Sequence, residues 1–253
     1  MVSLKIGKDL IPSVDLVIFD KDGTLIDVHQ YWVEMSFLRA ETIARHFHLD
    51  ETDVRNLASA MGVDTATGRI KESGPVGLKK REIVMQAAID YLQARGHRDS
   101  TADCTAAFEE VDRLSLTMFD KLIKEIPGTE KLLRELHENG CKIAIATSDR
   151  TPRAKLAMEH LDFLKYIDII VGADAIVSPK PDPETVTVIL EKLWCSHGNT
   201  VVVGDTDVDM DLGVRSGVKA CIGVFSGTTS KEELMKKTPY VIENVGLIEV
   251  NSS

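Results

Sequence analysis

The chain has 253 residues, of which 43% are hydrophobic and 5% aromatic, and it carries a formal net charge of -10. This composition is typical of a folded globular protein and excludes a largely disordered chain. The negative charge argues against a nucleic-acid partner, because binding to a phosphate backbone requires a basic surface. The N-terminus lacks the apolar region of a signal peptide, and no apolar stretch approaches the length of a membrane span. We therefore expect a cytoplasmic protein with no membrane partner.

The first predicted strand runs from about Val14 to Phe19 and ends in two aspartates. Asp20 and Asp22 are one residue apart and precede Gly23, and side chains two apart in a strand point the same way. Their carboxylates can therefore converge. Like charges held close together need a cation, a shared proton or a phosphoryl group between them. An acidic turn after an edge strand is the structural alternative, and this segment alone leaves both open.

Residues 28–124 show helical patterns and no strand-like run. Apolar residues recur at helical spacing in three segments, which predicts helices over Tyr31–Phe47, Lys79–Ala94 and Thr105–Ile126. The pattern indicates a helical insertion between two parts of a core.

After Pro127-Gly128, strand and helix patterns alternate to the end of the chain. Such alternation predicts an α/β core with a doubly wound, Rossmann-like parallel sheet that has helices on both faces. The predicted elements are helix Thr129–Glu138, strand Lys142–Ala146, helix Pro152–His160, strand Ile167–Val171, helix Pro183–Leu193, strand Val201–Val203, helix Asp207–Arg215 and strand Lys219–Val224. We expect Ser226–Ser230 to be a loop and residues 251–253 to be a frayed end.

Polar side chains follow the predicted strands at their carboxyl ends, where open parallel sheets bind ligands. Besides the aspartate pair, these are Thr147, Ser148, Lys180, Asp205 and Asp209. Carboxylates, hydroxyls and one lysine suit a phosphoryl group together with a hard cation such as Mg²⁺. Taken singly, each has a structural explanation: a turn hydroxyl, a solvent-exposed lysine, or acidic charges that stabilise a helix start.

Together and in this order, the motifs resemble those of the haloacid dehalogenase-like hydrolase superfamily. The matching segments are Asp20-x-Asp22-Gly23-Thr24, Thr147 after an apolar strand, Lys180, and Gly204-Asp205-x-x-x-Asp209. The resemblance covers the whole core, and the helical insertion is similar to the cap of the family's phosphoglycolate phosphatase-like branch. It implies a catalytic core of residues 1–27 and 125–253 and an all-helical cap domain of residues 28–124.

The resemblance also implies a role for each motif residue. Asp20 would be the nucleophile that forms an aspartyl-phosphate, and Asp22 the acid and later the base. Thr147, the backbone of Ser148, and Lys180 would hold the phosphoryl oxygens. Mg²⁺ would be bound by Asp20, the backbone carbonyl of Asp22, and Asp205. Asp209 would either bind the ion directly or contact one of its ligands.

These roles predict a Mg²⁺-dependent phosphatase that acts on a small phosphorylated metabolite. Asp22 favours phosphoryl chemistry, because the family's dehalogenases lack it. A phosphonatase, which would use a cap lysine among Lys71, Lys79 and Lys80, and a phosphomutase remain as alternatives. A phospho-accepting signalling domain fits poorly: its phosphorylated aspartate follows a strand in the middle of the chain order, whereas here the acidic pair follows the first predicted strand. A metabolite sensor that has lost turnover has no positive support in the sequence. The substrate and the oligomeric state are not predicted. Cap residues such as Tyr31, Trp32 or the Gly68–Gly77 stretch would select the substrate.

Overall fold

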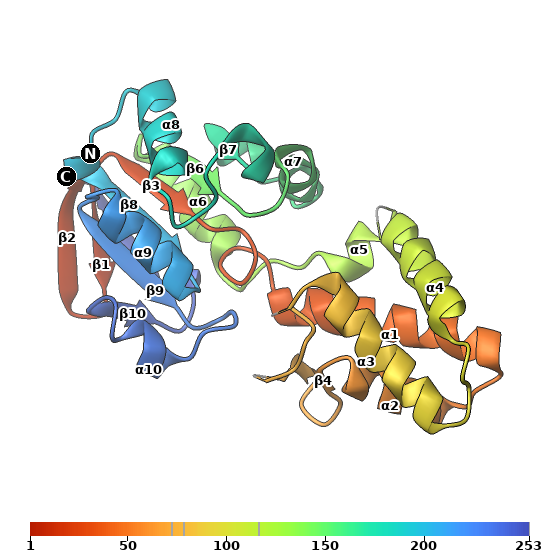
Figure 1. Ribbon diagram of the computed structural model, residues 1–253. Coiled ribbons are helices and arrows are strands. Elements are labelled where there is room, and N and C mark those ends of the chain that lie inside the picture. The colour runs from red at the N-terminus through yellow and green to blue at the C-terminus, as the bar shows by residue number, and fades with distance from the viewer. Residues whose placement is uncertain (72, 78, 116, 253) are drawn as a thin grey trace. The chain divides into compact units, whose positions relative to one another are not determined.

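The structure is a computed structural model that describes residues 1–71, 73–77, 79–115 and 117–252. The chain divides into two compact units (Figure 1). Met1–Asp27 and Glu125–Ser253 form one unit, here termed the α/β unit, and Val28–Lys124 form the other, termed the helical unit.

The α/β unit is built on a parallel sheet, as predicted. Among the described residues this sheet has six strands in the order β10-β9-β8-β3-β6-β7, and every neighbouring pair is parallel. The strands are β3 (Leu16–Phe19), β6 (Lys142–Ala146), β7 (Ile169–Val171), β8 (Thr200–Gly204), β9 (Ala220–Val224) and β10 (Tyr240–Ile242). All four residues of β3 are buried, as expected for a central strand covered on both faces.

Helices cover both faces of this sheet. Leu16 and Ile18 of β3 pack with Val186 and Ile189 of one helix and Leu212 of another. Their neighbours in β3 point to the opposite face. The helices of the unit are α6 (Thr129–Glu138), α7 (Thr151–His160), α8 (Glu184–Leu193), α9 (Asp207–Arg215) and α10 (Lys231–Leu234), with 3-10 turns at Leu164–Tyr166, Ala173–Ala175, His197–Asn199 and Val245–Leu247. Thus α8 and α9 lie on one face, while α6 contacts β6.

The central strand β3 marks the point where the strand order reverses. From β3 the chain continues to β6 and β7 on one side, and then returns to β8, β9 and β10 on the other. Sheets of this kind bind ligands outside the carboxyl ends of the strands at such a reversal. The residues that follow β3 therefore stand at the place where the fold favours a site.

A second sheet joins the two ends of the chain, and the sequence did not predict it. Among the described residues it has three antiparallel strands in the order β11-β1-β2, namely β1 (Val2–Ile6), β2 (Asp9–Val14) and β11 (Ile248–Ser252). The prediction of a frayed end was wrong for Asn251 and Ser252, which pair with Ser3 and Val2; Ser253 lies outside the described residues. The reason is tertiary, since this end of the chain pairs with β1, whose residues Val2 and Leu4 are buried.

The helical unit is mainly a bundle around its own apolar core. Its helices are α1 (Val28–Phe47), α2 (Glu51–Ala60), α3 (Arg81–Ala94), α4 (Thr101–Leu114) and α5 (Phe119–Leu122). Ile43, Leu57 and Phe108 lie in the core that α1, α2, α3 and α4 share. None of the described helices in either unit is long and apolar enough to span a membrane.

The predicted helix Thr105–Ile126 was wrong in extent. Helix α4 ends at Leu114 and α5 begins at Phe119, while Leu116 lies outside the described residues. The hydroxyl of Ser115 donates to the carbonyl of Asp112, and that of Thr117 donates to the carbonyl of Leu114. Such side-chain bonds compete with continuation of the helix.

The expectation of a purely helical insertion was also wrong in detail. Two short antiparallel strands, β4 (Val63–Asp64) and β5 (Arg69–Ile70), follow α2. Ile70 is buried in the apolar core of the unit, and Trp32 packs against that core. Trp32 and part of the Gly68–Gly77 stretch therefore contribute to packing, while Glu72 in that stretch lies outside the described residues.

Candidate active site

The turn after β3 brings the first aspartate to the reversal point of the sheet. The backbone N–H of Asp20 donates to the carbonyl of Val203, which fixes this residue against β8. Gly23 follows with a φ of +87°, a conformation that side-chain-bearing residues rarely adopt. A Cβ at Gly23 would also lie 2.6 Å from Cγ of Asp205. The glycine therefore permits both the turn and the close approach of a second carboxylate.

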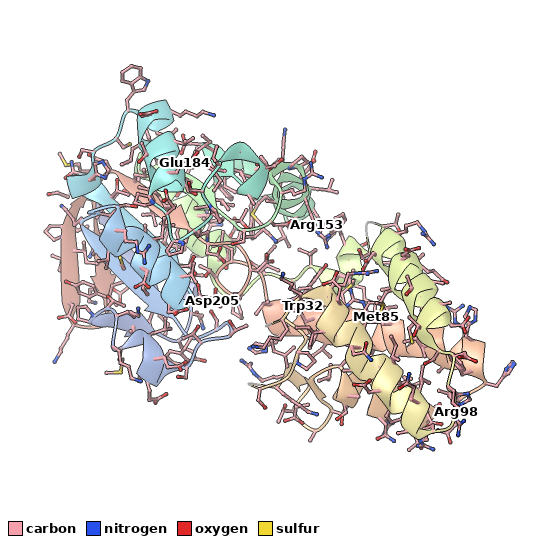
Figure 2. The ribbon with its side chains drawn as sticks, in the orientation of Figure 1. Trp32, Met85, Arg98, Arg153, Glu184 and Asp205 are labelled. Atoms are coloured by element: carbon pink, nitrogen blue, oxygen red, sulfur yellow. The ribbon has the colours of Figure 1, made fainter. Side chains whose placement is uncertain are left out.

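Three carboxylates from two strand ends gather here. Asp20, Asp205 and Asp209 each place a carboxylate oxygen within 4.8 Å of the others. Asp205 follows β8, and Asp209 lies in the first turn of α9 (Figure 2 labels Asp205). The sequence prediction put these residues at one edge of the sheet, and the structure brings all three into one cluster.

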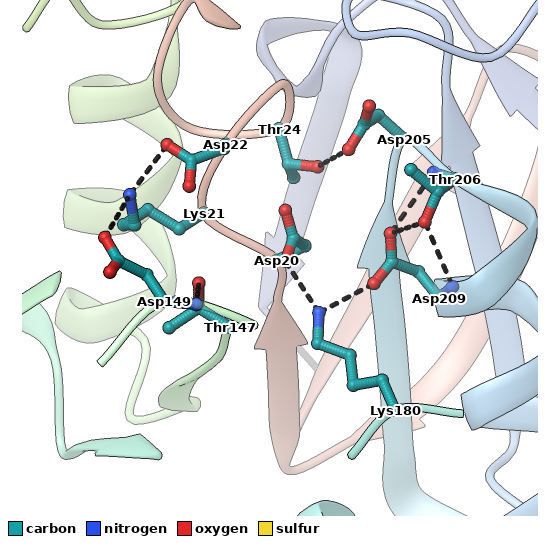
Figure 3. Close-up of polar contacts among 10 residues, drawn as sticks. All are labelled: Asp20, Lys21, Asp22, Thr24, Thr147, Asp149, Lys180, Asp205, Thr206 and Asp209. Carbon is teal, nitrogen blue, oxygen red and sulfur yellow. Dashed lines mark hydrogen bonds and ion pairs between the residues drawn. The ribbon is translucent and has the colours of Figure 1, made fainter. Parts of the chain in front are cut away.

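Lys180 joins this cluster from the loop after β7. Its Nζ lies 2.6 Å from Oδ1 of Asp20 and 2.8 Å from Oδ1 of Asp209, and its side chain is only 4% exposed (Figure 3). Burial by itself would lower the pKa of Lys180, but the two carboxylates outweigh it and raise the pKa above its ordinary value. Lys180 is thus a charged ammonium beside Asp20, and the alternative of an exposed lysine is excluded.

Three carboxylates face a single ammonium in this cluster, and their mutual repulsion affects their pKa values. Burial raises the pKa of Asp20 to about 7; Lys180 opposes this rise, while Asp209 and Asp22 add to it. Burial and the charges of Asp20 and Asp209 raise the pKa of Asp205 well above its ordinary value. Carboxylate oxygens are preferred ligands of Mg²⁺, and a divalent cation would relieve this repulsion. The donor set of the cluster therefore fits a magnesium ion.

Asp209 is held in place by the start of α9. Thr206 is the N-cap, and its backbone N–H and hydroxyl both donate to Oδ2 of Asp209, at 3.1 and 2.6 Å. The backbone N–H of Asp209 in turn donates to the Thr206 hydroxyl, which completes a capping box. A Cβ at Gly204 would stand 2.3 Å from Cβ of Asp209. Because the helix cap takes up Oδ2 of Asp209, its Oδ1 is the oxygen that accepts from Lys180.

Thr147 and Ser148 follow β6, which pairs with β3. Thr147 is buried and its hydroxyl accepts a hydrogen bond from the backbone N–H of Asp149 at 3.1 Å, whereas Ser148 is exposed. The structure places these two residues at the same sheet edge as Asp20 but shows no hydrogen bond between them and the carboxylate cluster. Their predicted role toward a phosphoryl group stays a prediction.

Asp22 does not join the cluster of three carboxylates. Its Oδ1 accepts a hydrogen bond of 2.6 Å from Nζ of Lys21, which also lies 3.4 Å from Oδ2 of Asp149 (Figure 3). Burial tends to lower the pKa of Lys21, but Asp22, Asp149 and Asp20 together raise it. No role was assigned to Lys21 or Asp149 from the sequence; an ionisable residue between the two aspartates of the motif was the available signal.

The segment after β9 was also missed as part of the site. The backbone N–H of Thr228 donates to Oδ2 of Asp205 at 3.0 Å, and the hydroxyl of Ser226 donates to the carbonyl of Gly23 at 2.7 Å. A Cβ at Gly227 would lie 1.9 Å from Oδ2 of Asp205. The prediction of a loop at Ser226–Ser230 is confirmed, and this loop in addition holds Asp205 and the turn after β3 together.

Comparison with known proteins finds relatives over most of this chain. The family model described as haloacid dehalogenase-like hydrolase matches residues 17–223. A phosphoglycolate phosphatase from Aquifex aeolicus is 32% identical over 83% of this chain and 84% of its own length. A phosphorylated carbohydrates phosphatase from Thermotoga maritima is 26% identical over 88% of this chain and 91% of its own length.

Solved structures show the same fold. A haloacid dehalogenase superfamily hydrolase of subfamily IA from Geobacter sulfurreducens matches with a TM-score of 0.61 and 16% identity, over 92% of this chain and 94% of that chain.

The parallel sheet with acidic residues at its reversal point defines a doubly wound α/β protein with a candidate active site, and the extent of the family match identifies the family. The chain belongs to the haloacid dehalogenase-like hydrolases. Within that superfamily it groups with enzymes named phosphatases.

Proposed function

We propose that this protein is a Mg²⁺-dependent phosphatase that hydrolyses a small phosphorylated metabolite through an aspartyl-phosphate on Asp20. The observation that carries the proposal is the arrangement around Asp20, whose carboxylate lies beside both the Lys180 ammonium and two further buried carboxylates. A phosphoryl group carries its charge on peripheral oxygens, so its transfer requires a nucleophile with cationic groups beside it.

The proposed chemistry has two steps. A carboxylate oxygen of Asp20 attacks phosphorus, the bond to the ester oxygen breaks, and the alcohol leaves with a proton from Asp22. Water then attacks the aspartyl-phosphate and gives a proton to Asp22, so that phosphate and free Asp20 are released. Lys180, at 2.6 Å from Asp20, is close enough to hold a phosphoryl oxygen beside the nucleophile. Thr147 and the backbone of Ser148 would hold the other oxygens.

Asp20, the backbone carbonyl of Asp22, Asp205 and Asp209 would hold the magnesium ion. When bound, the ion supplies positive charge that stabilises the phosphoryl oxygens. The role of the residues themselves is to keep the carboxylates converged, which Lys180, the cap of α9 and the loop after β9 achieve.

The names of the relatives give a first indication of the substrate class. The Aquifex and Thermotoga proteins are named for phosphoglycolate and phosphorylated carbohydrates. We therefore propose a small phosphomonoester of this kind as the substrate, and a panel that contains 2-phosphoglycolate and sugar phosphates as the first screen.

The test is phosphate release from this panel with Mg²⁺ and with EDTA. We expect release only with Mg²⁺, and we expect Asp20→Asn to lower it by at least about a thousandfold, because the nucleophile is lost. Asp207→Asn is the matched control, since Asp207 belongs to the same acidic segment but is exposed; it should change the rate by less than about twofold. Full activity of Asp20→Asn would refute the proposal.

The phosphonatase alternative requires a free lysine in the helical unit, and its three candidates differ in their contacts. Nζ of Lys71 donates to the carbonyl and the hydroxyl of Ser59 at 2.8 and 2.9 Å, so this ammonium is engaged within the helical unit. Lys79 and Lys80 are exposed. Borohydride inactivation in the presence of phosphonoacetaldehyde would favour a phosphonatase, and sugar-phosphate isomerisation without phosphate release would favour a mutase.

A further inference from the structure

Lys21 is a buried lysine between the two aspartates of the first motif, and the proposed chemistry assigns it no role. Its side chain is 5% exposed, whereas that of Asp22 is 41% exposed. Burying an ammonium is costly unless carboxylates pair with it. A residue placed here at that cost points to a task beyond packing.

The contacts of Lys21 are specific. Nζ donates to Oδ1 of Asp22 at 2.6 Å and lies 3.4 Å from Oδ2 of Asp149. The two carboxylates come from different strand ends, since Asp22 follows β3 and Asp149 follows β6. Lys21 thus bridges the turn that carries Asp22 to the loop that carries Thr147 (Figure 3).

Asp149 is itself fixed on several sides. Its backbone N–H donates to the hydroxyl of Thr147 at 3.1 Å, and its Oδ1 accepts from the backbone N–H of Arg150 at 2.8 Å. Its carbonyl accepts from the backbone N–H of Ala173 at 2.9 Å. The loop therefore gives Lys21 a rigid acceptor, and through Lys21 this rigidity reaches Asp22.

Asp22 needs such support more than the other acidic residues do. Asp209 is held by a helix cap and Asp205 by the loop after β9, and both are nearly fully buried. The Asp22 carboxylate is partly exposed, and a partly exposed side chain loses rotamer freedom only when a contact fixes it. The Lys21 ammonium is that contact.

We propose that Lys21 is a positioning residue for Asp22 and that Asp149 anchors Lys21. This inference rests on the proposed function, in which Asp22 passes a proton to the leaving oxygen as the bond from phosphorus to that oxygen breaks. Lys21 gives up no proton; it limits the orientations of the Asp22 carboxylate to those from which the leaving oxygen can be reached.

Two substrates separate this role from a structural one. The alkoxide released from an alkyl phosphate must be protonated as it leaves, whereas p-nitrophenolate is a stable anion that needs no proton. The ratio kcat/KM reports the steps up to formation of the aspartyl-phosphate. We expect Lys21→Met to lower kcat/KM for the best alkyl phosphate of the panel by about 10- to 100-fold, part of the contribution of a general acid. For p-nitrophenyl phosphate the same variant should lose less than about threefold.

Further variants keep the test decisive. Lys21→Arg should restore most of the alkyl-phosphate activity, because a guanidinium can also bridge two carboxylates. Asp149→Asn should lower the alkyl rate selectively but less than Lys21→Met, and it serves if Lys21→Met fails to fold. Lys219→Met is the matched control: Lys219 precedes β9 at the opposite sheet edge, and its Nζ donates to the carbonyls of Pro12 and Ser13. It should affect both substrates equally.

Equal losses on both substrates, or no loss on either, in Lys21→Met or in Asp149→Asn would overturn the role of Lys21 and leave the proposed function intact. A wild-type protein that releases phosphate from neither substrate would refute the proposed function and the inference with it. A selective loss on the alkyl phosphate supports both.

Discussion

Replacing Gly227 by alanine tests how tightly the loop after β9 encloses the acidic cluster. The added Cβ would lie 1.9 Å from Oδ2 of Asp205, and ordinary contact begins at 3.4 Å, so the two must separate by about 1.5 Å. The φ angle of Gly227 lies outside the left-handed region, so the alanine is resisted by its neighbours and not by its own backbone. The hydrogen bond from the Thr228 N–H to Asp205, now 3.0 Å, cannot survive such a movement.

The expected magnitude has two parts. Overpacking a filled interior costs about 1–3 kcal/mol of unfolding free energy. Loss of a group that orients a metal ligand typically weakens metal binding by about 10- to 100-fold, or about 1.4 kcal/mol per factor of ten. We therefore expect the Mg²⁺ dissociation constant of Gly227→Ala to rise by this factor while the protein stays folded.

The assay is calorimetric titration with Mg²⁺, together with the rise in melting temperature that Mg²⁺ produces. Gly198→Ala is the matched control, because a Cβ at Gly198 meets nothing within 4 Å and the residue precedes β8 at the opposite sheet edge. This control should bind Mg²⁺ as the wild type does. If Gly227→Ala also bound Mg²⁺ with unchanged affinity, the assignment of this loop to the metal cradle would be wrong.

Three more outcomes follow from the structure. Lys180→Met leaves Asp20 and Asp209 without their shared cation and should cost about 3–5 kcal/mol of unfolding free energy in metal-free urea titrations at pH 8; a midpoint like that of the wild type would contradict the pairing. Because burial raises the pKa of Asp20 from 3.8 to about 7, the folded state binds more protons than the unfolded state in this interval, and this group makes the metal-free protein less stable as pH rises through it. Mg²⁺ displaces that proton, so the rise in melting temperature with Mg²⁺ should be larger at pH 8 than at pH 5, and equal rises would count against Asp20 as a ligand. Leu4→Ala should lower the unfolding free energy by about 3 kcal/mol, because Leu4 is fully buried in the sheet that joins the chain ends; an effect below about 0.5 kcal/mol would show that this sheet adds little to the fold.

The sequence alone determined the class of fold and most of the candidate site. A buried strand such as β3 reads as an uninterrupted apolar run, and the helices between later strands follow the helical period; both are local properties of the chain. Polar residues that follow such strands, directly or in the next loop, lie at one edge of a parallel sheet. The positions of Asp20, Lys180, Asp205 and Asp209 at that edge could therefore be predicted without coordinates.

Only the tertiary structure decided which of these groups meet and what holds them. Lys180 reaches Asp20 across 160 positions of sequence, and no spacing rule states which carboxylates it will pair with. Lys21 is buried between Asp22 and Asp149, and the loop after β9 donates a hydrogen bond to Asp205. Both contacts form only because the sheet places the ends of separate strands side by side. The pairing of β11 was not predicted because its partner, β1, lies at the opposite end of the chain. Local patterns carry strand and helix periods, whereas contacts between distant segments arise only when the whole sheet assembles.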